Sequence, residues 1–413
     1  MEKEQLNLFD YVSSQGVRVL SVFDGMACGM LAMLESGIKV ERYVAYEIDK
    51  YAVQTSTHNL PMIEQRGDVF KADFTEFKGF DYLIGGSPCT YWSIAQKNNR
   101  ETEASGMGWE LFSQYVKALH EAKPKYFVYE NNKSMSKAIR ASIDEAFGFE
   151  AVYINSALVS AQNRQRLNWV GRRNEDGTYS KVDIKQPEDR GILLKDILEK
   201  HSYTMVSGPI KNPGYGIGYR GRIDNGKWVK QYEANGTEKA NALTTAQTDS
   251  MVAEPCRVGT YPNNAKNQTH DSQQYRVYST DAKSVTLCGN GGGLGAKTGL
   301  YAIESKSPYA TPCEWTKNGK PTKVTSGADG KIYDVYEVKD GYITIKGKNY
   351  PIKLADGFYI IRKPTVKECM RLQTVPEWYE FPVSDSQAYK MLGNGWTVSV
   401  ISWLLNATKE KEK

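Results

Sequence analysis

The stretch that decides the fold is "VRVLSVFDGMACGMLAMLESG", residues 17–37. It opens on an apolar run rich in β-branched residues, 17–23, passes through a turn that contains Gly25 and Gly29, and continues as a helix-compatible segment. A strand that leads through glycines into a helix is typical of the first unit of a parallel α/β sheet. Glycines at such a turn also let a ligand approach the backbone closely.

The same alternation of strand and helix continues to about residue 172. Helix-compatible segments separate five further strand-like runs, at 42–48, 80–86, 125–131, 149–155 and 166–171. This order predicts an α/β fold: a Rossmann-like, mainly parallel sheet with helices on both faces. Because such sheets bind ligands beyond the carboxyl ends of their strands, we expect the site in the loops that follow these runs.

The composition changes after about residue 174. Gly, Asn, Thr, Tyr and Gln crowd the stretch 203–300, and helical periodicity is lost there. Alternation in 331–363, with turn signals at Lys339-Asp340-Gly341 and Ala355-Asp356-Gly357, predicts β-hairpins. Helical character returns at 365–373 and 384–407. We predict an α/β domain at 1–180, a smaller loop- and strand-rich domain at 181–375, and a segment at 376–413 that returns to the first domain.

The overall composition excludes several classes of protein. Of 413 residues 40% are hydrophobic, enough for a sizeable core, and the six cysteines are scattered without a CxxC pair. With only four histidines, a structural zinc site has little to be built from, and we expect no metal. The charge of +5 fits a polyanionic partner only weakly. The chain lacks a long apolar window and a secretory signal, so we expect a cytoplasmic protein without membrane contact.

The first candidate site follows the first two predicted strands. Glu47 lies 22 residues after Gly25, near the spacing of an acid that binds ribose hydroxyls in nucleotide folds. Gly25-x-x-x-Gly29 differs from the GxGxxG pattern that cradles a pyrophosphate, so an adenosyl ligand without phosphates fits better than a dinucleotide. Asp68, in "GDV", could meet an adenine amino group. The alternative is a tight turn with solvated carboxylates.

The second candidate site centres on Cys89 in "GGSPCTYWS", residues 85–93, where the cysteine follows a predicted strand. Such a cysteine is a buried thiol, a metal ligand or a nucleophile. Glu130 ends the next strand in "VYEN", and "QNRQR" places Arg164 and Arg166 two residues apart before the last strand. Alone, an acid and two arginines form a surface ion pair, but at one sheet edge they favour a site, where nearby cations would stabilise a reactive thiolate.

Eight motifs in order resemble those of the C5-cytosine DNA methyltransferase family: "FDGMACG", "YEID", "GDV", "GGSPCTYWS", "VYEN", "QNRQR", "RKPTVKECMRLQTVP" and "AYKMLGNGWTVSV". They span residues 23–400, so the resemblance covers nearly the whole chain. It implies the class I methyltransferase fold with a target-recognition domain. It also implies S-adenosylmethionine as the cofactor, held by Phe23, Asp24, Gly25, Met26, Gly29, Glu47, Ile48, Asp68, Val69, Pro88, Asn394 and Trp396.

The resemblance further implies the chemistry. Cys89 adds to C6 of a cytosine flipped out of the DNA duplex, Glu130 offsets charge at N3, and Arg164 and Arg166 orient the base. Ser93 and Gln162 are implied to contact the DNA, whereas Tyr91 and Trp92 either pack the loop or touch the DNA. Three motifs depart from the commonest forms: "FDGMACG", "ENN" and "GNGWT". None of these departures removes a group that the chemistry needs.

Four alternatives are weighed against DNA methylation. A relative that methylates transfer RNA is the nearest, and the segment of about 190 residues between "QNRQR" and the RLQ-P motif favours duplex DNA instead. A DNA-binding relative without catalysis does not explain why all four catalytic residues, Cys89, Glu130, Arg164 and Arg166, are present together. A nicotinamide oxidoreductase leaves the PC loop unexplained, and an amino-group methyltransferase would carry a [DNS]-P-P-[YFW] tetrapeptide. We expect a monomer in a bacterial or phage-infected cell, either partnered by a restriction endonuclease or solitary.

Overall fold

The structure is a computed structural model, and the chain divides into two compact units. Unit 1 comprises Met1–Val159, Arg164–Glu188 and Gln373–Lys413, and unit 2 comprises Ser160–Asn163 and Asp189–Leu372. The residues described are 12–93, 100–199, 203–205, 222–224, 227–229, 257–260, 276–287, 299–304, 316–317, 320–321, 323–326, 332–345 and 347–409.

Unit 1 is built on an eight-stranded sheet, in which seven strands follow the order β3-β2-β1-β4-β5-β7-β6 and β8 pairs with β7. The pairs among β3, β2, β1, β4 and β5 are parallel, whereas β7 runs antiparallel to both of its neighbours on this path. The predicted mainly parallel sheet is therefore confirmed. The strands are β1 (Val12–Val22), β2 (Val40–Tyr46), β3 (Glu64–Gln65), β4 (Tyr82–Gly85), β5 (Tyr126–Asn132), β6 (Val152–Asn155), β7 (Gln165–Arg173) and β8 (Tyr179–Lys181).

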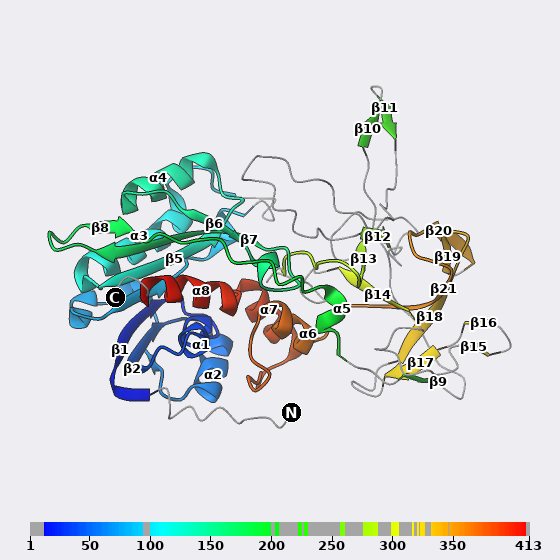
Figure 1. Ribbon diagram of the computed structural model, residues 1–413, viewed down its shortest axis with the longest axis horizontal. Helices are drawn as coiled ribbons and strands as arrows, with labels where there is room; N and C mark the ends of the chain where they lie inside the picture. Colours follow the sequence, from blue (N-terminus) through cyan, green and yellow to red (C-terminus); the bar gives the residue numbers. More distant parts are fainter. Residues whose placement is uncertain are drawn as a thin grey trace. The chain divides into compact units, whose positions relative to one another are not determined.

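Helices cover both faces of this sheet (Figure 1). The alternation of side chains along β4 shows which helices lie on each face. Leu83 points into the aromatic core beneath α3 (Gly106–Ala122) and α4 (Lys137–Phe147). Its neighbours Tyr82 and Ile84 point the other way, toward α8 (Val398–Lys409) and α1 (Cys28–Glu35). The remaining helices of unit 1 are α2 (Lys50–Asn59) and α7 (Asp385–Asn394).

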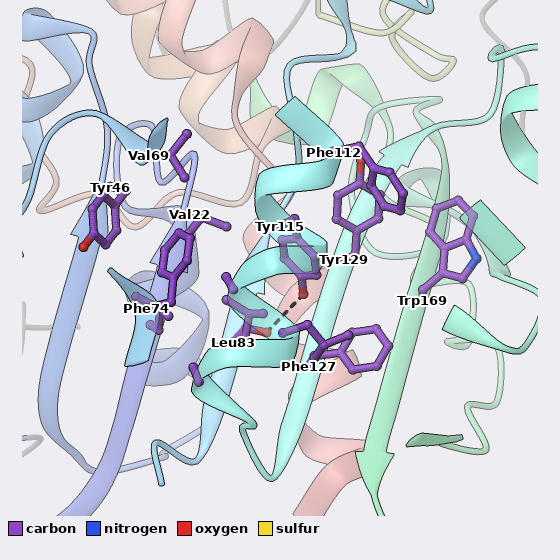
Figure 2. Close-up of a cluster of buried hydrophobic side chains, with 14 of the residues drawn as sticks. Val22, Tyr46, Val69, Phe74, Leu83, Phe112, Tyr115, Phe127, Tyr129 and Trp169 are labelled. Atoms are coloured by element: carbon purple, nitrogen blue, oxygen red, sulfur yellow. Dashed lines mark hydrogen bonds between the residues drawn. The ribbon is translucent and has the colours of Figure 1, made fainter. Parts of the chain in front are cut away.

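The close-up of the core under α3 shows large aromatic rings in contact (Figure 2). The Tyr115 hydroxyl, from α3, donates to the carbonyls of Val128 and Leu83 at 2.9 and 3.3 Å, so the helix is tied to two central strands as well as packed on them. Phe112 of α3 meets Tyr129 of β5 edge to face. Burying such rings stabilises the fold by roughly 1.5–3 kcal/mol each, and it holds the strand ends steady.

The C-terminal helix α8 packs on the α/β sheet of unit 1. Thr408 shares a hydrogen bond with the Tyr82 hydroxyl, and the Ser36 hydroxyl lies 3.1 Å from that of Ser402. Among the described residues, no helix is long and apolar enough to span a bilayer.

Unit 2 contains a nine-stranded sheet whose main order is β12-β13-β14-β21-β18-β17-β9. The predicted hairpin at Asp340-Gly341 joins β18 to β19, and both turn residues have positive φ, as a tight hairpin needs. The second predicted hairpin, at Ala355-Asp356-Gly357, is wrong, because β20 pairs with β19 while β21 pairs with β18 and β14. Most of the stretch 203–300 lies outside the described residues.

In the described part of unit 2 the strands are short and the helices few. A buried ion pair joins β21 to the helix that follows it: Arg362 Nη2 lies 2.6 Å from Glu368 Oε1. The strands are β9 (Tyr203–Met205), β12 (Arg257–Thr260), β13 (Arg276–Ser279), β14 (Leu300–Glu304), β17 (Lys323–Ser326), β18 (Ile332–Lys339), β19 (Tyr342–Ile345), β20 (Lys348–Pro351) and β21 (Gly357–Arg362). Two-stranded pairs are β10 (Arg222–Asp224) with β11 (Lys227–Val229) and β15 (Thr316–Lys317) with β16 (Lys320–Pro321). The helices are α5 (Leu194–Ile197) and α6 (Val366–Leu372).

Candidate active site

The predicted site residues follow strands that end side by side. In the register of the parallel pairs, Val22 lies opposite both Tyr46 and Gly85, and Gly85 lies opposite Tyr129. The loops after β1, β2, β4 and β5 therefore begin at one edge of the sheet. Since β7 is antiparallel to β5, its first residues lie at this same edge, with Arg166 opposite Asn132. Ligands bind α/β sheets at this edge.

The turn after β1 is held in an unusual conformation. Phe23 and Ala27 have φ values of 61° and 62°, a region that residues other than glycine rarely adopt, and Gly25 has 59°. The Phe23 and Asp24 N–H groups both donate to the Tyr46 carbonyl of β2. A Cβ built on Gly25 would have no heavy atom within 4 Å, so the backbone here is open to a ligand. Strained backbone of this kind clusters at ligand-binding and active sites, so this turn is a candidate for one.

Glu47 braces this turn from the end of β2. Its Oε2 accepts the Gly25 N–H at 2.8 Å, and its Oε1 accepts the Ile48 and Asp49 N–H groups at 2.8 Å. The carboxylate stays half-buried, with lone pairs left for hydroxyl donors, and the side chain of Ile48 beside it is 77% exposed. Glu47 and Ile48 thus present a polar and an apolar group side by side.

Asp68 lies after β3 and caps a short 3₁₀ helix, η2 (Val69–Lys71). Its carboxylate accepts the Phe70 N–H at 3.0 Å, and Val69 is buried in the aromatic core. This fixes the Asp68 backbone, and the rest of the carboxylate remains partly exposed.

Three other residues expected to contact the cofactor form the inner side of the turn. The Asp24 side chain is turned inward, where the Ser21 and Tyr43 hydroxyls donate to its Oδ1 at 2.6 and 2.7 Å. The Met26 carbonyl accepts the Tyr379 hydroxyl at 2.7 Å. At Gly29 a Cβ would lie 2.3 Å from Ile84, so glycine lets α1 pack tightly on the sheet.

The burial of Asp24 predicts how the stability of the fold depends on pH. Burial raises the pKa of Asp24 from 3.8 to about 6, and its Oδ2 has no hydrogen-bond partner among the described residues. Below pH 3.8 the carboxyl is neutral in both the folded and the unfolded chain. Between about pH 4 and pH 6 it ionises only in the unfolded chain, so the free energy of unfolding falls by about 3 kcal/mol as the pH rises through this range. Asp24→Asn removes this loss.

Urea unfolding of Asp24→Asn and the parent chain between about pH 4.5 and pH 7.5 checks this prediction. The stability of the variant relative to the parent should rise with pH up to about pH 6 and stay level above it. A difference that does not change with pH would contradict the buried, neutral carboxyl.

The loop after β4 approaches the end of β5 closely. A Cβ on Gly86 would lie 2.6 Å from the Glu130 carbonyl oxygen, so only glycine fits there. Ser87 is fixed from β5: its hydroxyl lies 2.7 Å from the Tyr129 hydroxyl, and the Asn131 amide donates to its carbonyl at 3.1 Å. Exposed Pro88 follows, and Cys89 begins the 3₁₀ helix η4 (Cys89–Tyr91). The Cys89 side chain itself lies outside the described residues.

Glu130 and Arg166 meet at this edge. The Arg166 Nε lies 2.6 Å from Glu130 Oε1, and both side chains are mostly buried, at 13% and 11% exposed. The pair is a close ion pair without an aligned hydrogen bond, because Oε1 lacks a donor of suitable geometry. Such a pair leaves hydrogen-bonding capacity on the carboxylate for a ligand.

Arg164 lies before β7, which begins at Gln165, and its guanidinium donates to the Gly393 and Gly395 carbonyls at the end of α7, at 3.2 and 2.7 Å. Arg166 lies on β7 itself and pairs with Glu130. The role of the two arginines in orienting the base stays a prediction. Arg164 supports the turn that carries Asn394 and Trp396.

That turn reaches the Cys89 loop. The Trp396 Nε1 lies 3.3 Å from where a Cβ on Gly86 would be, and Glu130 Oε2 lies 3.4 Å from the same point. Asn394 is exposed and Trp396 is half-buried. The structure thus brings the C-terminal motif, the Cys89 loop and Glu130 together.

The two residues expected to contact DNA lie in different units. Ser93 is half-buried and belongs to unit 1. Gln162 belongs to unit 2, bridges to Ser284 through its backbone, and is fully buried, with a side-chain amide that lacks a partner among the described residues. As described, Gln162 does not present its side chain to a ligand. Trp92 is fully buried in the core, so it packs the loop, and Tyr91 packs partly against the same core.

Sequence reasoning missed two residues of this site, Asn131 and Gln373. Asn131 holds Ser87, and the Gln373 amide donates to the carbonyls of Leu392 and Gly395 at 2.6 and 3.2 Å. Both residues lie inside motifs of the family resemblance, "VYEN" and RLQ-P. Only membership of these motifs could have identified them, because a single Asn or Gln is not distinctive in a sequence.

Comparison with solved structures concerns the fold. The structure titled Entamoeba histolytica methyltransferase EhMeth matches 97% of this chain and 99% of its own, with a TM-score of 0.54 and 12% identity. At this identity the match shows the fold alone, which is that of the class I methyltransferases.

Sequence comparison then defines the family. The model of the C-5 cytosine-specific DNA methylase family matches residues 17–410, so the chain belongs to this family. The orphan methyltransferase M.SPRI of Bacillus phage SPR is 28% identical, over 93% of this chain and 95% of its own. The type II methyltransferase M.HhaI of Haemophilus parahaemolyticus is 22% identical, over 94% of this chain and 93% of its own.

Proposed function

We propose that this chain transfers a methyl group from S-adenosylmethionine to C5 of a cytosine flipped out of a specific sequence in duplex DNA. Membership of the C5-cytosine DNA methylase family supports DNA cytosine methylation. The observation that carries the finer proposal is the buried Glu130–Arg166 ion pair, which lies at the same sheet edge as the Cys89 turn.

The residues at the β1 and β2 ends fit the adenosyl cofactor. The open backbone at Gly25 allows close approach, and the Glu47 carboxylate retains lone pairs for ribose hydroxyls. Ile48 offers an exposed apolar surface to the adenine ring, and Asp68 an acceptor to its amino group. When bound, the cofactor supplies an electrophilic methyl group. Asp24, Met26 and Gly29 support this turn from its inner side.

Loss of the Glu47 charge should weaken cofactor binding. In Glu47→Gln one of the two oxygens that accept backbone N–H groups becomes an amide donor, so the strained turn loses part of its brace. Since a hydrogen bond to a charged group is worth about 1.5–3 kcal/mol, we expect the Kd for S-adenosylmethionine to rise about 10- to 100-fold. Calorimetric titration measures it, with exposed Glu41→Gln on β2 as the control. Equal affinities for the two variants would contradict this role.

The chemistry then falls to the residues at the β4, β5 and β7 ends. The Cys89 thiolate adds to C6 of the cytosine, which makes C5 a carbon nucleophile. Glu130 shares a proton with N3 and so offsets the charge that develops on the ring, while Arg166 holds Glu130 in place. C5 takes the methyl group, the C5 proton leaves, and elimination frees Cys89. Flipping is required because the ring atoms are inaccessible inside the stack.

The nucleic-acid substrate is tested directly. Methyl transfer to duplex DNA and to transfer RNA, measured with labelled cofactor, should give product on DNA. Activity on RNA alone would overturn the proposal in favour of an RNA methyltransferase. A monomer that acts on duplex DNA in the bacterial or phage-infected cytoplasm fits the family, and the orphan description of the phage SPR relative supports a solitary enzyme over one paired with a restriction endonuclease.

A further inference from the structure

Two charged residues, Arg100 and Glu101, bring the chain back to the segment that follows Cys89. The Glu101 N–H donates to the Tyr91 carbonyl at 2.9 Å, and the Arg100 Nε donates to the Trp92 carbonyl at 3.2 Å. The Trp92 Nε1 in turn donates to Glu101 Oε2 at 3.0 Å. Arg100 and Glu101 thus bind both the backbone and the indole of residues 89–93, here called the Cys89 segment.

Each of the two residues also bridges to a second element. Both Glu101 oxygens accept the Gly108 N–H, in the first turn of α3, at 3.2 Å. The Arg100 Nη2 donates to the Ser134 carbonyl at 2.6 Å, four residues beyond Glu130. Arg100 therefore connects the Cys89 segment to the Glu130 segment, and Glu101 connects it to the helix bound to β4 and β5.

The sequence leaves room for this arrangement. A Cβ on Gly108 would lie 2.5 Å from both Glu101 Oε2 and Trp92 Nε1, and a Cβ on Gly106, where φ is 78°, would lie 2.6 Å from Glu101 Oε1. Any larger residue at either position would displace the Glu101 carboxylate, so these two glycines are required for this contact.

We propose that Arg100 and Glu101 are positioning residues that hold the Cys89 segment at a fixed separation from Glu130. This inference rests on the proposed function, because it concerns the same two groups. Cys89 lies only three residues before Trp92, so a shift of the buried indole is transmitted to the cysteine backbone. Misplacement of a reacting group by about 1 Å can cost roughly 100-fold in rate.

Single-turnover trapping tests the proposal. Duplex DNA with 5-fluorocytosine at the target keeps the Cys89–C6 bond after methyl transfer, because fluorine cannot leave C5 as the proton does. We expect Glu101→Gln to form the gel-stable adduct about 10- to 100-fold more slowly while its Kd for DNA changes less than about 3-fold. Exposed Glu103→Gln, which removes the same charge two residues away, should match the parent chain.

A double-mutant cycle and a conservative variant separate positioning from general stability. Trp92→Phe removes the indole donor together with part of the buried ring, so if Glu101 acts through Trp92 the effect of Glu101→Gln should be smaller in the Trp92→Phe background than in the parent chain. Arg100→Lys keeps the charge but loses the two guanidinium N–H groups that donate to the Trp92 and Ser134 carbonyls, so it should also slow adduct formation. Equal trapping rates for Glu101→Gln and the parent, or additive effects in the cycle, would overturn the inference alone. Failure of the parent to form any adduct would overturn the proposed function and the inference with it.

Discussion

Replacing Cys89 with alanine should abolish methyl transfer to DNA while DNA binding is retained. The thiolate is the only group proposed to form a covalent bond to the base, and removal of a covalent nucleophile costs about 10⁴- to 10⁶-fold in other enzymes. The turn that presents it does not depend on the thiol, because Ser87, Tyr129 and Asn131 hold the preceding residues. The variant should therefore fold and bind its DNA site as the parent does.

Labelled-methyl transfer and a DNA-binding titration on the same preparations measure the Cys89→Ala effect. Cys369→Ala is the matched control: it also removes one thiol, but from the interior of α6, where burial raises the pKa of Cys369 well above its ordinary value and keeps it protonated. The control should retain transfer. Measurable transfer by Cys89→Ala, within about tenfold of the parent, would exclude the covalent mechanism.

The second large effect is expected at Glu130. Glu130→Gln keeps the size of the side chain but removes the charge that pairs with Arg166 and the proton that N3 would share. Since removal of one transition-state donor or acid typically costs about 10²- to 10³-fold, we expect kcat to fall by that factor. The KM for DNA should change little, because Glu130 is mostly buried and lies at the reacting base.

Steady-state kinetics of Glu130→Gln against Glu145→Gln provides the comparison. Glu145 is an exposed carboxylate on α4, so its neutralisation should leave kcat unchanged. A fall in both variants would indicate a nonspecific effect of charge, and an unchanged kcat for Glu130→Gln would remove Glu130 from the mechanism.

The fold of unit 1 could be predicted from the sequence because its strands are short apolar runs separated by helices. The β1 turn shows why the meeting of Gly25 and Glu47 could also be predicted. The two residues follow adjacent strands, and parallel strands end at one edge of the sheet. In unit 2 the chain does reverse between β20 and β21, but the two strands do not pair with each other as a hairpin would. Local turn chemistry identifies a reversal of the chain, whereas partner strands are chosen by the whole sheet.

The site was harder to predict in detail than the fold. Arg164 and Arg166 are two residues apart in the sequence, yet β7 begins between them, and one guanidinium binds the α7 turn while the other pairs with Glu130. Likewise, Asp24 lies in the glycine turn but points inward, because Ser21 and Tyr43 offer it donors. Side-chain direction at a turn depends on partners distant in the sequence, which no local pattern shows.

The most direct test of whether this chain methylates cytosine in a specific DNA sequence is expression in a bacterium that lacks its own cytosine methylation. The host DNA is then analysed by bisulfite sequencing. The account predicts cytosines protected from conversion at one recurring DNA sequence in cells with the parent chain, and full conversion in cells with Cys89→Ala. Full conversion with the parent chain, expressed and folded, would contradict it.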